Sequence, residues 1–395
     1  MSKSETSNAH SVATRLAHMG RPWSPDMPFV NPPVVRASTV LFEDVHAMHD
    51  PASKYVYGRR GTPTSNALAD ALTELEGPAC AGTVLTPSGL AAISVALLSF
   101  LGAGDHVLIP DCAYRPVREL CDSLIPRLGV EVSYYDPTIG AGIAALTRAN
   151  TKVIYLESPG SLTFEIQDTP AIVAHARAIG AVTIIDNTWA TPLMFRALDF
   201  GVDVTLMAAT KYIVGHSDAM LGTVSANEAT WKRLKHTHGA MGMFTGPDDM
   251  WLALRGLRTL SVRMRHQEQS ALEIARWLQT RPEVAQVLHP GLPQDPGHAI
   301  WKRDFNGSAG LFGIILKPSS DEAVAAMLDG LQLFGLGYSW GGYESLAIPC
   351  ELTGIRTATT WAAEGPLVRL QIGLEDPADL IADLDKGLAR LNAAG

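Results

Sequence analysis

Two short stretches, each an apolar run that ends in polar residues, constrain this chain more than any other feature. The first run covers residues 182–186 and ends in Asp186, and the second covers residues 204–207 and is soon followed by Lys211. Short runs rich in β-branched and apolar residues are typical of buried parallel strands. The carboxyl ends of such strands line the ligand-binding crevice of an open α/β sheet. The sequence therefore predicts a carboxylate and a primary amine in one crevice.

An acid and an amine that share an apolar crevice are suited to the chemistry of an aldehyde cofactor. A buried lysine loses its proton more easily because desolvation disfavours the charged ammonium. Pyridoxal phosphate is an aldehyde that needs a lysine Schiff base and an acidic partner for its pyridine nitrogen. Lys211 and Asp186 are the candidates for these two roles, and the hydroxyl of Thr210 offers the cofactor a hydrogen bond. Taken singly, a lysine or an aspartate at a strand end is more often structural.

The string around Lys211 is longer and more specific than either residue alone. Residues 208–217 read A-A-T-K-Y-I-V-G-H-S. This string closely resembles the lysine signature of the cystathionine γ-synthase/β-lyase family of pyridoxal-phosphate enzymes, and the order of motifs resembles that family from about Arg15 to Leu391. The resemblance implies an α/β protein of fold type I, with a mostly parallel sheet between helices in a large domain and a smaller α+β C-terminal domain. It also implies a carbon–sulfur lyase that depends on pyridoxal phosphate and acts on an amino acid.

The pattern of the chain predicts three regions. Residues 1–60 are punctuated by prolines that exclude long helices, and we expect them to form an arm that contacts a neighbouring subunit. Residues 61–256 alternate between helix and strand patterns and are predicted to be the large cofactor-binding domain. Residues 257–395 mix short strands with helices and are predicted to be the C-terminal domain that binds the substrate carboxylate.

Hydrophobic periodicity predicts where the main elements lie. Strands are expected at 83–86, 106–110, 130–135, 153–156, 182–186, 204–207, 310–316 and 367–372. Helices are expected at 66–75, 90–101, 115–128, 169–179, 193–200, 321–328 and 377–391, and a long helical tract at about 248–278 is expected to bridge the domains.

Composition excludes several classes of protein. The formal net charge is −9, with 40 acidic against 31 basic residues and no basic block, which argues against nucleic acid as a partner. The 4 cysteines have no C-x-x-C spacing, so no metal site is expected. The first thirty residues lack an apolar signal core, and the most apolar segment, 89–101, is too short to span a bilayer. We therefore expect a cytoplasmic protein with no membrane partner.

The cofactor phosphate has two candidate binding elements. The turn before Gly89 leads into a predicted helix, whose exposed N–H groups and dipole bind phosphate, and glycine permits a close approach. The resemblance assigns this role to Gly89 and Leu90. It also assigns Tyr57 and Arg59, in the string Y-G-R-R-G-T-P-T, to the phosphate of the adjacent subunit. On that basis the active site needs at least a dimer, and the family suggests a homotetramer.

The resemblance also assigns residues around the cofactor ring and the substrate. Tyr114 matches the family tyrosine that stacks on the ring, contacts the substrate and assists proton transfer. Ser339 and Trp340 belong to the string S-W-G-G-Y-E-S, and Arg369 emerges from a predicted strand. A guanidinium can bind a carboxylate through two hydrogen bonds, so Arg369 suits the α-carboxylate of an amino acid. Singly, a packing tyrosine or a surface arginine is the ordinary interpretation.

Two details favour the β-lyase branch of the family. Trp340 stands where γ-lyases and γ-synthases commonly have leucine, and residues 157–161 read E-S-P-G-S without the asparagine of other branches. β-Elimination of L-cystathionine, a step of methionine biosynthesis, yields L-homocysteine, pyruvate and ammonia. The alternatives are a cystathionine γ-lyase, γ-synthase or methionine γ-lyase reaction, and general cysteine-S-conjugate β-elimination or cysteine desulfhydration. Residues 235–240 lack the tyrosine that bacterial β-lyases often have there, and His236 or His238 is a candidate replacement.

Two interpretations outside this family are weaker. A nicotinamide-dependent oxidoreductase would have G-x-G-x-x-G after a strand, but Trp340 occupies the third glycine position after Gly335 and Gly337. A cofactor-sensing regulator would have a DNA-binding domain or a basic face, and the sequence has neither.

Overall fold

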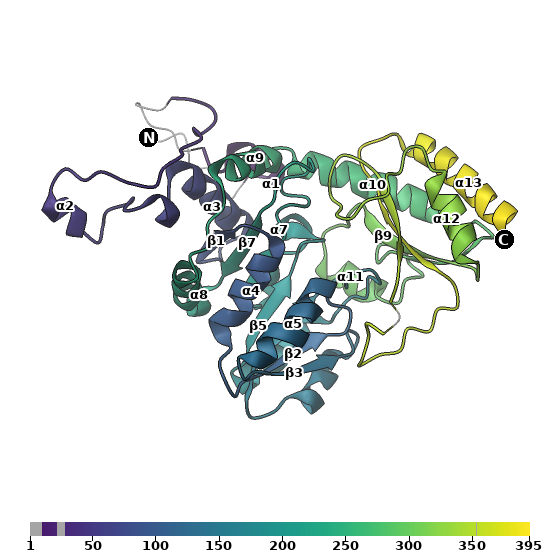
Figure 1. Cartoon of the computed structure of the whole chain (residues 1–395), viewed down its shortest axis with the longest axis horizontal. Helices are drawn as coiled ribbons and strands as arrows, with labels where there is room; N and C mark the ends of the chain where they lie inside the picture. The colour runs from purple at the N-terminus through teal and green to yellow at the C-terminus, as the bar shows by residue number, and fades with distance from the viewer. Residues whose placement is uncertain (1–9, 22–27, 353) are drawn as a thin grey trace.

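A seven-stranded sheet forms the centre of the larger part of the molecule (Figure 1). Its strand order is β1-β7-β6-β5-β4-β2-β3. The strands from β2 to β6 pair in parallel, whereas β7 runs antiparallel to both β1 and β6. The bounds are β1 (Gly82–Thr86), β2 (His106–Pro110), β3 (Glu131–Tyr135), β4 (Thr151–Glu157), β5 (Val182–Asp186), β6 (Val204–Met207) and β7 (Gly222–Ala226). The structure is a computed structural model that describes residues 10–21, 28–352 and 354–395.

Helices cover both faces of this sheet. Successive side chains of its strands point to opposite faces, so each face carries apolar side chains that a layer of helices buries. Ile184 packs in one apolar core and Ile185 in the other. α4, α5 and α8 contribute to the core that contains Ile184, and α3 and α6 contribute to the core that contains Ile185. Their bounds are α3 (Pro63–Glu76), α4 (Gly89–Phe100), α5 (Arg115–Arg127), α6 (Thr169–Ile179) and α8 (Glu228–Ala240). With both faces covered, the ends of the strands are left to carry functional side chains.

A smaller sheet lies in the C-terminal part of the chain, with the antiparallel order β10-β11-β9-β8 (Figure 1). α12 and α13 pack on it around a third apolar core. α10 contributes Leu260 to a core of the main sheet and Ile274 to that of the smaller sheet, so it bridges the two. The bounds are α10 (Leu260–Leu278), β8 (Val284–Leu288), α11 (His298–Asp304), β9 (Leu311–Leu316), α12 (Asp321–Asp329), β10 (Leu346–Cys350), β11 (Leu367–Gln371) and α13 (Pro377–Ala394). Of the helices in the described ranges, none combines the length and apolarity needed to cross a membrane.

The N-terminal segment contains α1 (Val12–His18), α2 (Val45–His49) and the 3-10 turn η1 (Gly58–Arg60). α1 is anchored by the fully buried Leu16, whereas the region around α2 projects from the rest of the molecule (Figure 1). Large apolar side chains are exposed on this segment, among them Phe29 at 70%, Leu41 at 90% and Val45 at 72%. Apolar side chains gathered on a projecting segment indicate a surface that packs against another protein.

Two of the helices expected from the sequence are interrupted. The expected helix 193–200 is divided into α7 (Thr191–Met194) and η3 (Ala197–Phe200), because Phe195 is extended, with φ −145° and ψ 107°. The expected tract 248–278 is divided into α9 (Pro247–Leu257) and α10, because Thr259 has φ −106° and ψ 2°. The other expected helices and strands are present, with small displacements of their ends.

β7 was not expected, and neither were α8, α11, β8, β10 and the 3-10 helix η2 (Gly140–Leu146). The sequence of β7 is G-T-V-S-A, which lacks the apolar run that marks the other central strands. Its polar side chains are nevertheless buried, and the hydroxyls of Ser225 and Thr83 share a hydrogen bond of 2.8 Å across the sheet. Among the described residues the buried hydroxyl of Thr223 has no such partner, and the apolar contribution of β7 comes from the fully buried Val224 and Ala226.

Candidate active site

The ends of β5 and β6 bring the predicted carboxylate and amine to one edge of the main sheet. The strands pair in parallel with Asp186 opposite Leu206, and Lys211 follows shortly after. Thr188 donates to Asp186 Oδ1 from its N–H group at 2.9 Å and from its hydroxyl at 2.5 Å. The same hydroxyl accepts the N–H of Ala208 at 2.9 Å, which ties the two strand ends together. Both predicted groups therefore lie at the same edge of the sheet.

The amine of Lys211 contacts residues from the C-terminal part of the chain. Its Nζ donates to Ser339 Oγ at 2.6 Å and lies 5.5 Å from the centre of the Trp340 ring. Burial, and then the nearby charge of Arg369, lower the pKa of Lys211 to about 8, although the carboxylate of Asp186 opposes this shift. A lysine amine with such a pKa is partly neutral near physiological pH, as a nucleophile or a general base requires.

The lowered pKa of Lys211 predicts how fast the cofactor-free protein captures pyridoxal phosphate at different pH values. Only the neutral amine attacks an aldehyde. The capture rate should therefore rise up to pH of about 8 and then level off, instead of rising toward the ordinary lysine pKa of 10.5. Stopped-flow absorbance measures this rate. A rate that still rises about tenfold per pH unit above about pH 9 would mean that the amine titrates as an ordinary lysine.

A second carboxylate lies beside Asp186, at the end of β4. Glu157 is opposite Asp186 in the parallel register, and its Oε2 accepts the N–H of Tyr114 at 2.8 Å. Burial and the charge of Asp186 raise the pKa of Glu157 well above its ordinary value. Burial also raises the pKa of Asp186, but hydrogen bonds from Thr188 and the charge of Lys211 oppose that shift. Because two adjacent buried carboxyl groups do not both ionise readily, the proton resides on Glu157 and Asp186 carries the charge.

Tyr114 lies between β2 and α5, and 45% of its surface is exposed. Burial of the phenol, followed by the charges of Asp186 and Glu157, raises its pKa, whereas the charge of Arg369 lowers it. The phenol is therefore protonated at neutral pH, and it lies within electrostatic range of both the predicted acid and the predicted carboxylate-binding arginine.

β11 and the segment before β10 supply the residues predicted to bind the substrate carboxylate. Arg369 Nη2 donates to the Ser339 carbonyl at 2.9 Å. Ser339 has a left-handed φ of +82°, and a Cβ on Gly341 would lie 3.0 to 3.2 Å from backbone atoms of Lys211 and Tyr212. This segment thus packs directly against the lysine. Within the described ranges Arg369 has no carboxylate partner, so its other N–H groups are available to an anion.

α4 begins at Gly89 and presents free backbone N–H groups. Ser88 is the N-cap residue, and its hydroxyl accepts the N–H of Ala91 at 3.1 Å. In the part of the chain that the structure describes, no hydrogen bond engages the N–H groups of Gly89 and Leu90. A Cβ on Gly89 would lie only 2.6 Å from the Cβ of Ala208, so the helix start packs against the segment that follows β6. Free donors at a helix N-terminus are suited to a phosphate.

Replacement of Gly89 by alanine should weaken cofactor binding. The new methyl group would also lie 3.0 Å from the Cα of Ala208, which is backbone and has no rotamer to change, so the start of α4 must shift. Overpacking of this kind costs about 1–3 kcal/mol, which is about 5- to 150-fold in the dissociation constant of pyridoxal phosphate. Gly246→Ala is the control, because a Cβ there meets no atom within 4 Å. Equal cofactor affinity in the two variants would exclude this packing role for Gly89.

Tyr57 and Arg59 lie on the N-terminal segment of the chain, at η1, and not at this edge of the main sheet. Tyr57 precedes η1 and is 47% exposed, and Arg59 Nη1 donates to the Gly239 carbonyl at the end of α8 at 3.0 Å. Their predicted contact with the phosphate of an adjacent subunit stays a prediction. His238, also on α8, donates to the Leu85 carbonyl at 2.7 Å, so one of its two ring nitrogens is engaged with β1.

The hydroxyl of Thr210, predicted to bind the cofactor, is engaged with the segment before β7. It accepts the N–H of Leu221 at 2.9 Å and donates to the Leu221 carbonyl at 3.2 Å. Two further residues of the site, Thr188 and Glu157, were not expected from the sequence. A threonine two residues after an aspartate can hydrogen-bond to it locally, and Glu157 ends a strand as Asp186 does, so both had a signal in the sequence.

The residues at this edge fit pyridoxal phosphate. They provide an amine with a lowered pKa, a charged carboxylate on the adjacent strand, a half-exposed phenol, a guanidinium available to an anion, and free N–H donors at a helix start. These are the groups that the aldehyde, the pyridine nitrogen, the ring, the substrate carboxylate and the phosphate require. Among the described residues, no group of three His, Cys, Asp or Glu side chains could hold a metal ion.

Known proteins resemble this chain over almost its whole length. The family model for Cys/Met metabolism PLP-dependent enzymes matches residues 13–389. Cystathionine beta-lyase MetC of Escherichia coli is 47% identical over 96% of this chain and 98% of its own. The L-alanine/L-glutamate racemase of Wolbachia pipientis is 41% identical over 95% of this chain and 96% of its own. A crystal structure of cystathionine gamma synthase from Xanthomonas oryzae, in complex with aminoacrylate and cysteine, covers 98% of this chain and 100% of that chain, with a TM-score of 0.90 and 34% identity.

These relationships confirm the predicted fold and the predicted cofactor. The chain has the mostly parallel main sheet and the smaller C-terminal sheet that the resemblance implies, and these relatives cover 96% and 98% of it. The chain belongs to the Cys/Met metabolism family of pyridoxal-phosphate-dependent enzymes.

Proposed function

We propose that this enzyme is a carbon–sulfur lyase that converts L-cystathionine and water to L-homocysteine, pyruvate and ammonia, by β-elimination followed by hydrolysis of the three-carbon product, a step of methionine biosynthesis. The observation that carries the proposal is the position of the Lys211 amine, which donates to Ser339 and lies beside the ring of Trp340. The guanidinium of Arg369 donates to the carbonyl of the same Ser339, and its charge acts on the Lys211 amine. A group that can move a proton therefore adjoins a group that can hold an amino-acid carboxylate.

Several residues at this edge of the sheet would hold the cofactor in this proposal. The N–H groups of Gly89 and Leu90 would bind its phosphate, Asp186 would pair with its pyridine nitrogen, and the Lys211 amine would bond to its aldehyde carbon. When bound, pyridoxal phosphate supplies an electron-accepting ring that makes the Cα proton of the substrate acidic. Glu157, the protonated neighbour, leaves the negative charge on Asp186 for the pyridine nitrogen.

The remaining side chains act on the substrate. Arg369 binds the α-carboxylate and thereby orients the amino acid. Once the substrate amine replaces it on the cofactor, the neutral Lys211 amine would take the proton from Cα. Tyr114 would stack on the cofactor ring, and its protonated phenol or the ammonium of Lys211 would deliver a proton to the departing sulfur. Ser339 and Trp340 line the region around the substrate next to Lys211.

The substrate preference separates this proposal from general cysteine desulfhydration. Pyruvate formation is measured from L-cystathionine and from L-cysteine under the same conditions. We expect the higher kcat/KM with L-cystathionine, because Trp340 provides a surface for a side chain that extends beyond the sulfur. A higher kcat/KM with L-cysteine would favour the desulfhydrase alternative.

Amino-acid racemisation is a second candidate, favoured by the relationship to the Wolbachia racemase. Both reactions begin with removal of the Cα proton, and racemisation then returns a proton to the opposite face. Lys211 and the protonated phenol of Tyr114 are the two acid–base groups that could serve the two faces. Chiral chromatography after incubation with L-alanine tests this candidate. Formation of D-alanine faster than pyruvate forms from L-cystathionine would favour the racemase.

The assembly proposed for the enzyme is a homo-oligomer, at least a dimer and, by the family resemblance, a tetramer. The exposed apolar side chains of the projecting arm, within the proposed region 1–60, support a subunit contact. We propose 61–256 as the cofactor domain and 257–395 as the substrate-carboxylate domain of each subunit. Sedimentation equilibrium tests the assembly, and a mass equal to one chain would exclude it. A cytoplasmic location stays a prediction.

A further inference from the structure

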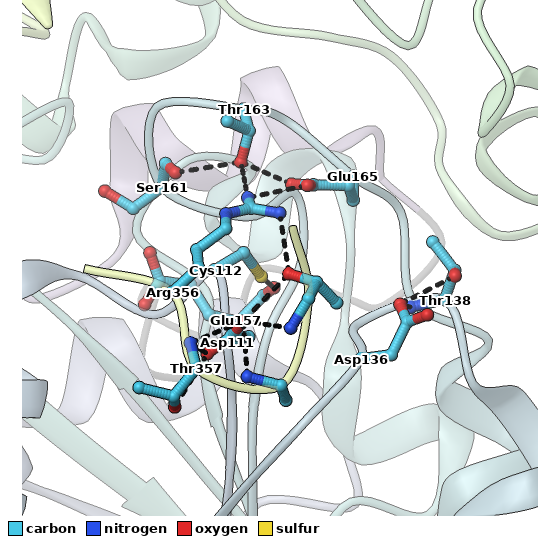
Figure 2. Close-up of polar contacts among 12 residues, drawn as sticks. Asp111, Cys112, Asp136, Thr138, Glu157, Ser161, Thr163, Glu165, Arg356 and Thr357 are labelled. Atoms are coloured by element: carbon cyan, nitrogen blue, oxygen red, sulfur yellow. Dashed lines mark hydrogen bonds and ion pairs between the residues drawn. The ribbon is translucent and has the colours of Figure 1, made fainter. Parts of the chain in front are cut away.

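The connection between β10 and β11 leaves the smaller sheet and lies against the main sheet. Its described residues 354–361 contact the end of β2 through backbone N–H groups and a hydroxyl, and they contact the hairpin after β4 through an arginine. Figure 2 shows Arg356 against Thr163 and Glu165, and Thr357 against Asp111. We call residues 354–361 the docked loop.

The first contact of the docked loop is with Asp111, directly after β2. One carboxylate oxygen accepts the N–H of Thr357 at 2.9 Å, and the other accepts the N–H groups of Ala358 at 3.0 Å and Thr359 at 2.8 Å. The Thr359 hydroxyl also donates to Asp111 at 2.8 Å, and Arg118 of α5 donates at 2.9 Å. The Asp111 side chain is 0% exposed. A fully buried charge thus depends on backbone N–H groups from the other part of the chain.

The charge of Asp111 is maintained by these contacts. Burial by itself would raise the pKa of this carboxyl group, but the hydrogen bonds from Thr357, Thr359 and Arg118 outweigh burial and hold the pKa below its ordinary value. The carboxylate is therefore ionised at any pH at which the enzyme would be assayed.

The second contact is an ion pair made by Arg356. Its Nη2 donates to Glu165 Oε1 at 2.7 Å and also to the hydroxyl of Thr163. The Arg356 side chain is 8% exposed and that of Glu165 is 20% exposed. The partners belong to the hairpin that begins after Glu157, so the docked loop is attached to the ends of both β2 and β4.

Both contacts lie close in the chain to residues of the active site. Asp111 is followed by Cys112, Ala113 and Tyr114, and the Cys112 carbonyl accepts the N–H of Ser161 in the hairpin at 2.9 Å. On its other side the docked loop leads into β11, which carries Arg369. The docked loop therefore joins the segment that carries the proposed ring-stacking phenol to the strand that carries the proposed carboxylate-binding arginine.

We propose that Asp111 and Arg356 are positioning residues that fasten the docked loop and so fix the placement of Tyr114 relative to Arg369. The proposal rests on the proposed function insofar as Tyr114 and Arg369 contact an amino-acid substrate. Neither positioning residue touches Lys211 or Asp186 through a hydrogen bond or ion pair in the described ranges, so their effect should be on substrate binding and not on cofactor bonding.

Asp111→Asn is the informative substitution, because it keeps the size of the side chain and removes the charge. One oxygen becomes an amide NH₂ group, which cannot accept the N–H donors of the docked loop. Glu119→Gln is the matched control: it removes one carboxylate from an exposed ion pair with Arg115 in the same helix, α5, with side chains that are 64% and 70% exposed. Arg356→Gln tests the second contact independently.

The test uses the holoenzyme and three measurements. The first is hydrogen–deuterium exchange of the amides of Thr357, Ala358 and Thr359. The second is the dissociation constant for glycine, which has the amine and carboxylate of the substrate but no group to eliminate, followed by the visible absorbance of the cofactor. The third is the visible absorbance band of the cofactor in the absence of glycine.

In Asp111→Asn we expect exchange of these amides to increase about tenfold or more and the glycine dissociation constant to increase about 10- to 100-fold, with an unchanged absorbance band. Arg356→Gln should shift both quantities in the same direction, and Glu119→Gln should shift neither. If Asp111→Asn does not fold, Thr359→Ala, which removes only one hydroxyl contact, replaces it and should give smaller changes of the same sign.

Two results would overturn the proposal. Unchanged exchange would show that Asp111 does not fasten the docked loop, and faster exchange with wild-type glycine affinity would show that the loop contributes to stability alone. Because glycine is not a substrate for β-elimination, these measurements remain decisive even if the wild-type enzyme does not cleave L-cystathionine. Failure of the proposed function would appear only in the turnover assay.

Discussion

Replacement of Lys211 by alanine is expected to abolish turnover and the visible absorbance band of cofactor bonded to the protein. Lys211 is assigned both the bond to the cofactor and the removal of the Cα proton, and its pKa of about 8 suits both tasks. Loss of general base catalysis alone costs up to about 10⁴-fold, and loss of the covalent attachment adds to this.

Steady-state kinetics and an absorbance spectrum measure the two effects of the Lys211→Ala change. Lys211→Arg is the matched variant, because it keeps a cationic side chain that cannot bond to an aldehyde or act as a base near neutral pH. It should be as inactive as the alanine variant. Retention of both turnover and the absorbance band in Lys211→Ala would remove the basis of the assignment.

Replacement of Arg369 by alanine is expected to weaken substrate binding strongly and to leave cofactor bonding intact. Arg369 has no carboxylate partner among the described residues, and its Nη2 donates to the Ser339 carbonyl. Hydrogen bonds to charged groups contribute about 1.5–3 kcal/mol each. Loss of about 2–4 kcal/mol would raise KM about 30- to 1000-fold.

The measurement for Arg369→Ala is KM for L-cystathionine together with the cofactor spectrum. Arg115→Ala is the control, because Arg115 lies next to Tyr114 in the chain but its side chain is 70% exposed and pairs with Glu119. An unchanged KM in Arg369→Ala, or an equal change in both variants, would exclude Arg369 as the main carboxylate ligand.

The sequence predicted the edge of the main sheet at which the candidate site lies, because that prediction depends on local patterns. The apolar runs before Asp186 and Lys211 are β5 and β6, with the bounds expected for both strands. Parallel pairing then places the ends of these strands side by side without further information. Hydrophobic periodicity and the direction of strands are sufficient for this part of the site.

The contribution of the C-terminal part could not be derived from local patterns. Ser339 contacts Lys211 across 128 positions of the chain, and only the family resemblance suggested that they meet. The left-handed backbone of Ser339 has no signal in its residue type, because that conformation usually favours glycine. The functional roles of these residues stay predictions that the variants above test.

Contacts made by isolated polar residues in the loops were not predictable. Asp111 and Thr357 of the docked loop are 246 positions apart in the sequence, and neither stretch has a periodic pattern. β7 was missed for a related reason, since it alternates Thr223 and Ser225 with the buried Val224 and Ala226 and has no apolar run. Long-range polar pairs of this kind require the tertiary structure.

In the proposed function the enzyme breaks the Cβ–S bond of L-cystathionine. The most direct measurement is the identity of the products that the purified holoenzyme forms from L-cystathionine, resolved by chromatography and mass spectrometry. We expect L-homocysteine and pyruvate in equal amounts, with ammonia. L-Cysteine and 2-oxobutyrate would exclude the proposed function, because they would show that the Cγ–S bond is broken and that the enzyme is a γ-lyase.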